Sequence, residues 1–315
     1  MTVAFIFPGQ GSQAIGMGKA LYDAYPASRA VFEEVDEALG EKLSTLIFEG
    51  DPAELQLTAN AQPALMVVSL AALRALESQK GVVLQRDARF VAGHSLGEYS
   101  ALAAAGALKI ADAARLLRLR GAAMQKAVPV GEGAMAALLG ANPELAQKIA
   151  GEATAASGAL CQLANDNGGG QIVVSGAKSA VELAIEIAKA NGVKRAMLLP
   201  VSAPFHCALM KPAAEAMREA LAKTEIAPPV VDLVANVTAA PVRDPDRIRE
   251  LLVEQVCGAV RWRECMGFMH KQGAELFVEI GAGKVLAGLV KRTADGARAL
   301  NVGTPQEVEA FSLII

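Results

Sequence analysis

Apolar residues along the chain gather into short runs and longer helical stripes that alternate with one another. The run 3–7 is continuously apolar and stops at a Gly-rich turn, which is typical of a buried strand. Helical stretches then extend to about residue 79, a second apolar run covers 88–92, and Ala/Leu-rich helices occupy 97 to about 127. The alternation of strand and helix predicts an α/β core with a parallel sheet.

In the middle of the chain the predicted elements are shorter and follow a different order. Short strands and helices follow in the order β-α-β-β-α-β, which is the pattern of a ferredoxin-like unit. They are expected at Ala134–Leu139, Pro143–Glu152, Leu160–Ala164, Ile172–Ser175, Ser179–Ala190 and Arg195–Leu199. We therefore expect residues 130–199 to form a small inserted subdomain. Residues 1–129 and 200–315 would together form a large, discontinuous domain, and a cleft between two domains is a common ligand site.

After Pro200 the chain returns to longer amphipathic stretches. Helices are expected near 209–223, 245–256 and 261–272, followed by a strand at Glu275–Ile280 and one more helix. These elements would complete the large domain.

Composition narrows the classes of function. Of the 315 residues, 53% are hydrophobic and 20% are charged, which allows a substantial core, and the net charge of −3 does not favour nucleic-acid binding. The longest Ala/Leu stretch, Ala101 to Leu119, contains charged residues that a membrane span would not tolerate. The N-terminal apolar run lacks a basic leader, and the four cysteines have no disulfide or metal spacing. We therefore expect a cytoplasmic protein without a metal.

The most informative motif is Gly93-His94-Ser95-Leu96-Gly97, which follows the second apolar run and precedes a helix. Gly-x-Ser-x-Gly in this context is the form of a nucleophile elbow, in which the serine hydroxyl faces outward and the next amide can point at an oxyanion. Ser95 and Glu98 also form the pattern of a capping box, which needs only a helix start. Glu98 could serve such a cap beside a nucleophilic serine.

A serine nucleophile needs a base, and the chain has only three histidines. His94 is the neighbour of Ser95, and adjacent side chains diverge around a tight turn. His270 lies in a helix whose apolar stripe is formed by other residues, so it is expected on the solvated face. His206 lies between a predicted strand and a helix, and by elimination it is the best base.

The turn Gly9-x-Gly11 after the first strand imitates a dinucleotide fingerprint. That interpretation requires a second strand ending in an acid about twenty residues later, whereas residues 28–39 have apolar positions at helical spacing. The turn could instead supply a backbone amide, such as that of Gln10, to an oxyanion hole.

Arg118 and Arg120 lie close together in one predicted helix. The default for either is a solvated surface position, and the alternative is a fork that binds a substrate carboxylate. The sequence does not choose between them.

Taken together, these segments resemble the malonyl-CoA:acyl-carrier-protein transacylases of bacterial fatty-acid synthesis. The resemblance covers nearly the whole chain. Its motifs are Phe7–Gln13, Thr58–Pro63, Gly93–Ala101, Arg120-Gly121, Gly133–Ala137, His206–Pro212, Gln255 and Glu279–Leu286. One departure is Gly258-Ala259-Val260, where relatives often have Asn-Pro-Val.

The resemblance implies an α/β-hydrolase-like core and a set of roles. Ser95 would be acylated, with His206 as its base and acid. The backbone carbonyl of Gln255 would replace the acid of a triad, and the amides of Gln10 and Leu96 would form the oxyanion hole. Two further roles concern the acyl group: Arg120 would hold the malonyl carboxylate, and Phe205 would disfavour an α-methyl group.

The resemblance also implies partners and alternatives. The substrates would be malonyl-CoA and an acidic acyl carrier protein, in a ping-pong reaction without a cofactor, and we expect a monomer. Candidate docking cations are Lys194, Arg195, Lys211, Lys284, Lys291 and Arg292. The alternatives are a serine esterase or thioesterase, a malonyltransferase of a polyketide pathway, and a non-catalytic scaffold that binds carrier proteins.

Overall fold

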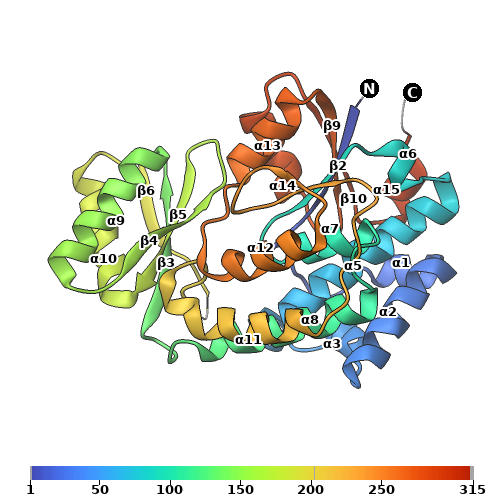
Figure 1. Ribbon diagram of the computed structural model, residues 1–315, viewed down its shortest axis with the longest axis horizontal. Helices are drawn as coiled ribbons and strands as arrows, with labels where there is room; N and C mark the ends of the chain where they lie inside the picture. Colours follow the sequence, from blue (N-terminus) through green and yellow to red (C-terminus); the bar gives the residue numbers. More distant parts are fainter. Residues whose placement is uncertain (1, 202, 313–315) are drawn as a thin grey trace.

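The computed structural model describes residues 2–201 and 203–312 and contains two β-sheets (Figure 1). The larger sheet has the strand order β10-β9-β1-β2-β7-β8. Its strands are β1 (Thr2–Phe7), β2 (Phe90–Gly93), β7 (Asp232–Val234), β8 (Pro241–Val242), β9 (Ala274–Ile280) and β10 (Arg298–Val302). Neighbouring strands are parallel except β7 and β8, which are antiparallel. The predicted α/β class and parallel sheet are confirmed.

Strand β1 buries side chains on both of its faces. Phe5 and Phe7 belong to the larger core cluster, whereas Ala4 and Ile6 belong to a second cluster. Since successive side chains of a strand point to opposite faces, such a strand must be covered on both sides. The larger cluster includes residues of α2 (Pro26–Leu39), α5 (Thr58–Lys80) and α8 (Ile110–Lys126). The second includes residues of α13 (Trp262–Lys271) and α14 (Val285–Thr293).

Helix α5 is the longest of these helices, with 23 residues. Its length and composition would suffice to cross a membrane, yet 83% of its apolar window is buried inside the protein, which is expected of a core helix. The other helices around the large sheet are α1 (Lys19–Ala24), α3 (Leu43–Glu49), α4 (Pro52–Gln56), α6 (Leu84–Asp87), α7 (Gly97–Ala104), α11 (Lys211–Ala222), α12 (Pro245–Cys257) and α15 (Pro305–Ala310).

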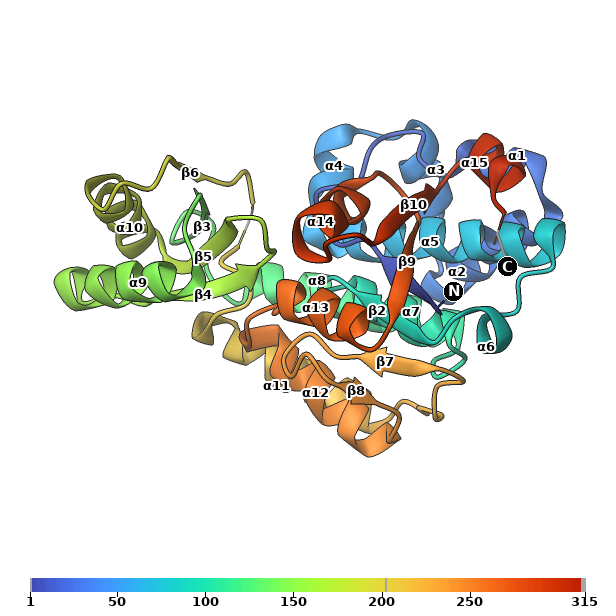
Figure 2. The same cartoon turned by 90° about the horizontal axis from the view of Figure 1, so that it is seen from above.

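The second sheet forms a lobe beside the large one, as Figure 2 shows from above. It is antiparallel, with the order β4-β5-β3-β6. Its elements are β3 (Gly133–Leu139), α9 (Pro143–Ser157), β4 (Cys161–Asp166), β5 (Gln171–Ala177), α10 (Lys178–Ala190) and β6 (Arg195–Leu198). One face packs against α9 and α10 in a cluster of its own, while Met135 and Val173 on the other face join the larger core cluster.

The edge strand β4 connects the small sheet to the large region. The amide of Asp166 donates to the carbonyl of Val260 at 2.9 Å, and the amide of Val260 donates to the carbonyl of Ala164 at 2.9 Å. The carboxylate of Asp166 also pairs with Arg263 of α13 at 2.8 Å. The chain from Val260 to Arg263 is therefore bound to β4 through both backbone and side-chain contacts.

The sequence-based prediction missed three strands and two helices, namely β7, β8, β10, α6 and α15. Strands β7 and β8 have only three and two residues, so they are too short to show a hydrophobic period. Strand β4 also continues through Asn165 and Asp166, beyond the strand that was expected to end at Ala164. The ferredoxin-like unit and the boundaries at 130 and 199 stay predictions.

Candidate active site

Ser95 lies on the tight turn between β2 and α7. Its φ is 54°, in the left-handed region that costs free energy for a residue other than glycine. The flanking glycines make the turn possible. A Cβ on Gly93 would lie 1.8 Å from the carbonyl of Gly97, and a Cβ on Gly97 would lie 2.3 Å from the carbonyl oxygen of Phe7. The backbone segments thus approach too closely for any side chain at either position.

The capping box predicted for Ser95 and Glu98 is wrong. Helix α7 has no side-chain cap, and the amide of Ser95 donates to Asn236 Oδ1 at 2.8 Å. The carboxylate of Glu98 instead accepts from the Asn236 amide at 2.9 Å and from Gln255 Nε2 at 3.0 Å. These donors come from distant parts of the chain, and they turn Glu98 into the interior.

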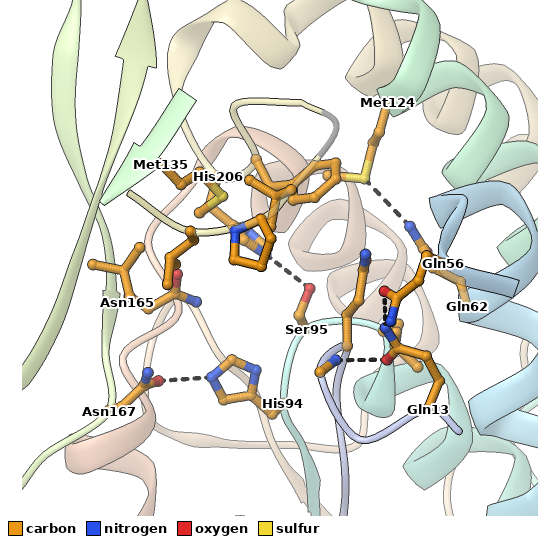
Figure 3. A pocket seen from close by; sticks show the side chains of 18 of the residues that line it. Gln13, Gln56, Gln62, His94, Ser95, Met124, Met135, Asn165, Asn167 and His206 are labelled. Carbon is orange, nitrogen blue, oxygen red and sulfur yellow. Dashed lines mark hydrogen bonds between the residues drawn. The ribbon is translucent and has the colours of Figure 1, made fainter. Parts of the chain in front are cut away.

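The side chains of Ser95 and His206 point toward one another across the site (Figure 3). The Ser95 hydroxyl donates to His206 Nε2 at 2.7 Å. The other ring nitrogen, Nδ1, donates to the carbonyl of Gln255 at 2.9 Å and to that of Gly258 at 3.2 Å. Because Nδ1 faces two acceptors, it carries the proton and leaves Nε2 free to accept from Ser95.

His206 is held as the neutral base. Burial, and after it the positive charge of Arg120, lowers the pKa of His206 to about 3. The acceptor at Nδ1 is a pair of carbonyl oxygens, and among residues 2–201 and 203–312 no carboxylate bonds to the ring. The second of these acceptors, Gly258, had not been predicted.

The other histidines have partners of their own. His94 Nε2 bonds to Asn167 Oδ1 at 2.8 Å, so its ring points away from the Ser95 hydroxyl (Figure 3). It also packs edge-on against Trp262. His270 is half-buried and its Nδ1 bonds to the carbonyl of Ala274 at 3.0 Å, so the solvated position predicted for it is wrong.

The structure distinguishes Arg118 from Arg120, which the sequence alone could not do. Arg118 pairs with Glu41 and donates to the Ala59 carbonyl at 2.8 Å. Arg120 is only 1% exposed and lies beside Ser95, with Nη2 at 3.2 Å from Ser95 Oγ. The two residues therefore have different environments on one helix.

The hydrogen-bond partners of Arg120 are neutral oxygens. Nη1 donates to Gln62 Oε1 at 2.7 Å and Nη2 donates to Gln255 Oε1 at 2.8 Å. Nε has no partner in the described part of the chain. Burial lowers the pKa of Arg120, and the neighbouring Tyr99 and Glu98 oppose that shift. A guanidinium with a free donor and no carboxylate partner is suited to bind an anion.

The side chains of Gln255 and Asn236 had not been predicted to act in the site. Gln255 was expected to act through its carbonyl, but its side chain also contacts Arg120, Ser95 and Glu98. Asn236 follows β7, and its Nδ2 donates to the carbonyl of Gly93 at 2.7 Å. A polar residue directly after an apolar run could have indicated Asn236, although β7 itself was missed.

Ser95, Arg120 and His206 line a cavity of about 390 Å³. Gln10 and Leu96 line it, and neither of their amides has an acceptor in the described part of the chain. Phe205 lines it as well and is 8% exposed. Within residues 2–201 and 203–312, no group of three or more His, Cys, Asp or Glu residues is arranged to hold a metal ion.

Comparisons with known proteins agree with this arrangement. The family described as acyl transferase domain matches residues 4–310. The chain is 50% identical over 307 residues to malonyl CoA-acyl carrier protein transacylase of Bacillus subtilis (strain 168), which covers 98% of this chain and 95% of the relative. The chain belongs to the acyl transferase family.

Solved structures show the same fold as this acyltransferase. The acyl-carrier-protein S-malonyltransferase of Bartonella henselae is 57% identical, with a TM-score of 0.95 over 98% of each chain. A malonyl-transacylase in complex with its type II PKS acyl-carrier protein is 40% identical, with a TM-score of 0.94 over 98% of each chain. The protein is an acyltransferase, and its serine, histidine and buried arginine lie in one cavity.

Proposed function

We propose that this acyltransferase moves the malonyl group of malonyl-CoA to the phosphopantetheine thiol of an acyl carrier protein. The names of its relatives support this activity. The single observation that carries it is the buried guanidinium of Arg120 at 3.2 Å from Ser95 Oγ. A malonyl ester on Ser95 brings its free carboxylate next to a fixed cation. An acetyl ester has no such group.

In the first half-reaction Ser95 attacks the thioester carbonyl while His206 Nε2 takes the hydroxyl proton. The carbonyls of Gln255 and Gly258 stabilise the imidazolium through Nδ1. The developing oxyanion would accept from the free amides of Gln10 and Leu96. His206 then gives the proton to the coenzyme A thiolate as it leaves.

In the second half-reaction the carrier thiol enters the same cavity. It loses its proton to His206 and attacks the malonyl ester on Ser95, which regenerates the serine hydroxyl. The kinetics are ping-pong, because coenzyme A leaves before the carrier protein reacts.

The carboxylate of the substrate also changes the pKa of His206. The positive charge of Arg120 lowers the pKa of His206. A malonyl carboxylate on Arg120 cancels that charge, so the pKa of His206 rises toward its usual value and the ring becomes a stronger base. The acyl group with the carboxylate thereby favours its own transfer.

The shape of the cavity supports selection by size. Phe205 comes directly before His206 and its ring lines the cavity. A methyl group on the α-carbon of the acyl chain would crowd this ring, so methylmalonyl-CoA is a poor substrate.

A polyketide carrier protein is the second candidate acceptor. The structural relative bound to a type II PKS acyl-carrier protein favours it, since that relative matches 98% of this chain. The reaction on the enzyme would be the same, and only the carrier protein would differ.

The remaining parts of the proposal concern partners and location. We propose an acidic carrier protein, a monomeric enzyme, a cytoplasmic site of action and no cofactor beyond the two substrates. Exposed cations such as Lys194, Arg195 and Lys211 are candidates for docking the carrier protein, whereas Lys284 pairs with Glu307 at 3.2 Å.

Intact-mass analysis after mixing with malonyl-CoA tests the proposal. We expect a stable malonyl adduct on the wild-type protein, absent from Ser95→Ala and discharged when holo carrier protein is added. Rapid release of free malonate would indicate an esterase instead. A protein without any adduct would contradict the proposed transfer.

A further inference from the structure

Beneath Ser95 lies a buried carboxylate that the proposed reaction does not use. Glu98 is 1% exposed, and its carboxylate accepts from the Asn236 amide and from Gln255 Nε2. Burial raises the pKa of Glu98 to about 7, while these hydrogen bonds and the charge of Arg120 oppose that shift. A carboxylate in the interior costs free energy unless a donor or a cation compensates it.

The side chain of Gln255 joins this carboxylate to Arg120. Its Oε1 accepts from Arg120 Nη2 at 2.8 Å, and its Nε2 donates to Glu98 Oε2 at 3.0 Å. An amide between a cation at its oxygen and an anion at its nitrogen is polarised by both, so the two hydrogen bonds strengthen each other. Gln255 is fully buried, which keeps water out of this connection.

Arg120 has no nearer anion in the described part of the chain. It forms no salt bridge there, and its hydrogen bonds go to Gln62, Gln255 and Ser95. The charge of Arg120 affects the pKa of Glu98, and the charge of Glu98 affects the pKa values of Tyr99 and Cys265. Of these only Arg120 carries a positive charge, so Glu98 and Arg120 form the one pair of opposite charges there.

We propose that Glu98 is a positioning residue that sets the acyl selectivity of the enzyme. It is the internal counter-charge of Arg120, and through Gln255 it competes with the carboxylate of the substrate. The inference rests on the proposed function. Glu98 partly compensates the positive charge of Arg120. Arg120 therefore binds a malonyl carboxylate strongly enough to select it, and weakly enough to release it when the malonyl group moves to the carrier thiol.

The test compares kcat/KM for malonyl-CoA and acetyl-CoA at pH 8, where the Glu98 carboxylate is ionised, with holo carrier protein as acceptor. In Glu98→Gln the amide oxygen can accept the same two hydrogen bonds, but the charge is lost. We expect the malonyl-to-acetyl ratio to rise about tenfold, with a lower KM for malonyl-CoA. Effects on Ser95 and on the oxyanion act on both substrates and cancel in the ratio. An unchanged or lower ratio overturns the inference.

Two further variants serve as controls. Glu98→Asp keeps the charge and is expected to keep a ratio close to the wild-type one. Asp36→Asn neutralises another buried acid, which contacts Ser44 and Lys42, and is expected to leave the ratio unchanged. A wild-type protein without any malonyl preference would contradict the proposed function itself, which separates the two failures.

Stability gives a second readout, which does not depend on turnover by any variant. Arg120→Ala leaves Glu98 as a buried carboxylate without its cation. We therefore expect the double variant Arg120→Ala/Glu98→Gln to unfold at a higher temperature than Arg120→Ala at pH 8. A double variant that is less stable than Arg120→Ala would show that the two charges are not coupled.

Discussion

The cavity beside Ser95 has two sides that are built differently. The polar floor consists of Ser95 and Arg120, which line the cavity, and of Glu98, Asn236 and Gln255, which lie behind them and bond to them or to one another. All five residues come from the large region. The apolar wall consists of Met135, Val173, Leu199, Val201 and Phe205, from the small sheet and the segment that follows it.

The difference between the two sides separates two tasks. Hydrogen bonds fix both the distance and the direction of a group, so the polar floor can hold reacting atoms in place. Apolar contacts exclude volume and are non-directional, so the apolar wall can select an acyl group only by its size. Variants of the polar floor should change the rate for every acyl group or the response to charge, and variants of the apolar wall should change the preference by size.

The largest effect is expected at the base that faces the polar floor. His206→Ala removes the acceptor of the Ser95 proton, and kcat/KM should fall about 10⁴-fold for malonyl-CoA and acetyl-CoA alike. Steady-state transfer to holo carrier protein measures it. The neighbouring Cys207→Ala, whose thiol bonds to the carbonyl of Pro204, should keep most of the activity. A His206→Ala protein that stays active would remove this residue from the reaction.

The next effect concerns the support of the turn. Asn236→Ala removes the bonds to the Ser95 amide and to the Gly93 carbonyl. The free energy of unfolding should fall by about 2–4 kcal/mol, and kcat should fall about 10²-fold because Ser95 shifts. Urea unfolding and initial rates measure both. Asn191→Ala, which loses one exposed bond, is the matched control, and equal losses in the two variants would contradict this role.

A smaller effect is expected at the apolar wall. Phe205→Ala makes room for an α-methyl group, so the preference for malonyl-CoA over methylmalonyl-CoA should fall about tenfold. Competition between the two thioesters, followed by mass analysis of the acylated carrier protein, gives the ratio. An equal loss of transfer from malonyl-CoA and methylmalonyl-CoA, with an unchanged ratio between them, would contradict a role of Phe205 in selection by size.

The smallest effect is in the pH dependence. His206 acts in its neutral form, so activity is lost as the pH falls through its pKa. Burial and Arg120 lower that pKa to about 3. Protonation of His206 should therefore cause no fall in kcat/KM for acetyl-CoA as the pH falls through 6.5. In Arg120→Ala one of the two causes is gone, and the acid limb should move to higher pH. An acid limb at the same pH in both proteins would contradict the coupling.

Local patterns predicted the parts of the site that depend on local geometry. The glycines around Ser95 are required by backbone contacts within one turn and with Phe7, so their spacing is visible in the sequence. His206 emerged by elimination, since the chain offers few alternatives. The parallel sheet followed from the alternation of strands and helices, whereas β7 and β8 were too short to be seen.

The polar floor could not be predicted in the same way. Glu98 has the spacing of a helix cap, but donors 138 and 157 residues away in the chain bind its carboxylate instead. Arg118 and Arg120 differ only in the face of α8 on which they lie. Tertiary packing decides such pairings, and one sequence does not reveal which distant amides will meet a carboxylate.

The central claim is that Arg120 holds the substrate carboxylate, and the malonyl-to-acetyl ratio of kcat/KM in Arg120→Ala tests it most directly. Arg118→Ala, two residues away on the same helix, is the control. We expect malonyl transfer by Arg120→Ala to fall about 10²–10³-fold with acetyl transfer spared or raised, and the ratio of Arg118→Ala to stay at the wild-type value. An equal loss of malonyl and acetyl transfer in Arg120→Ala would contradict the account.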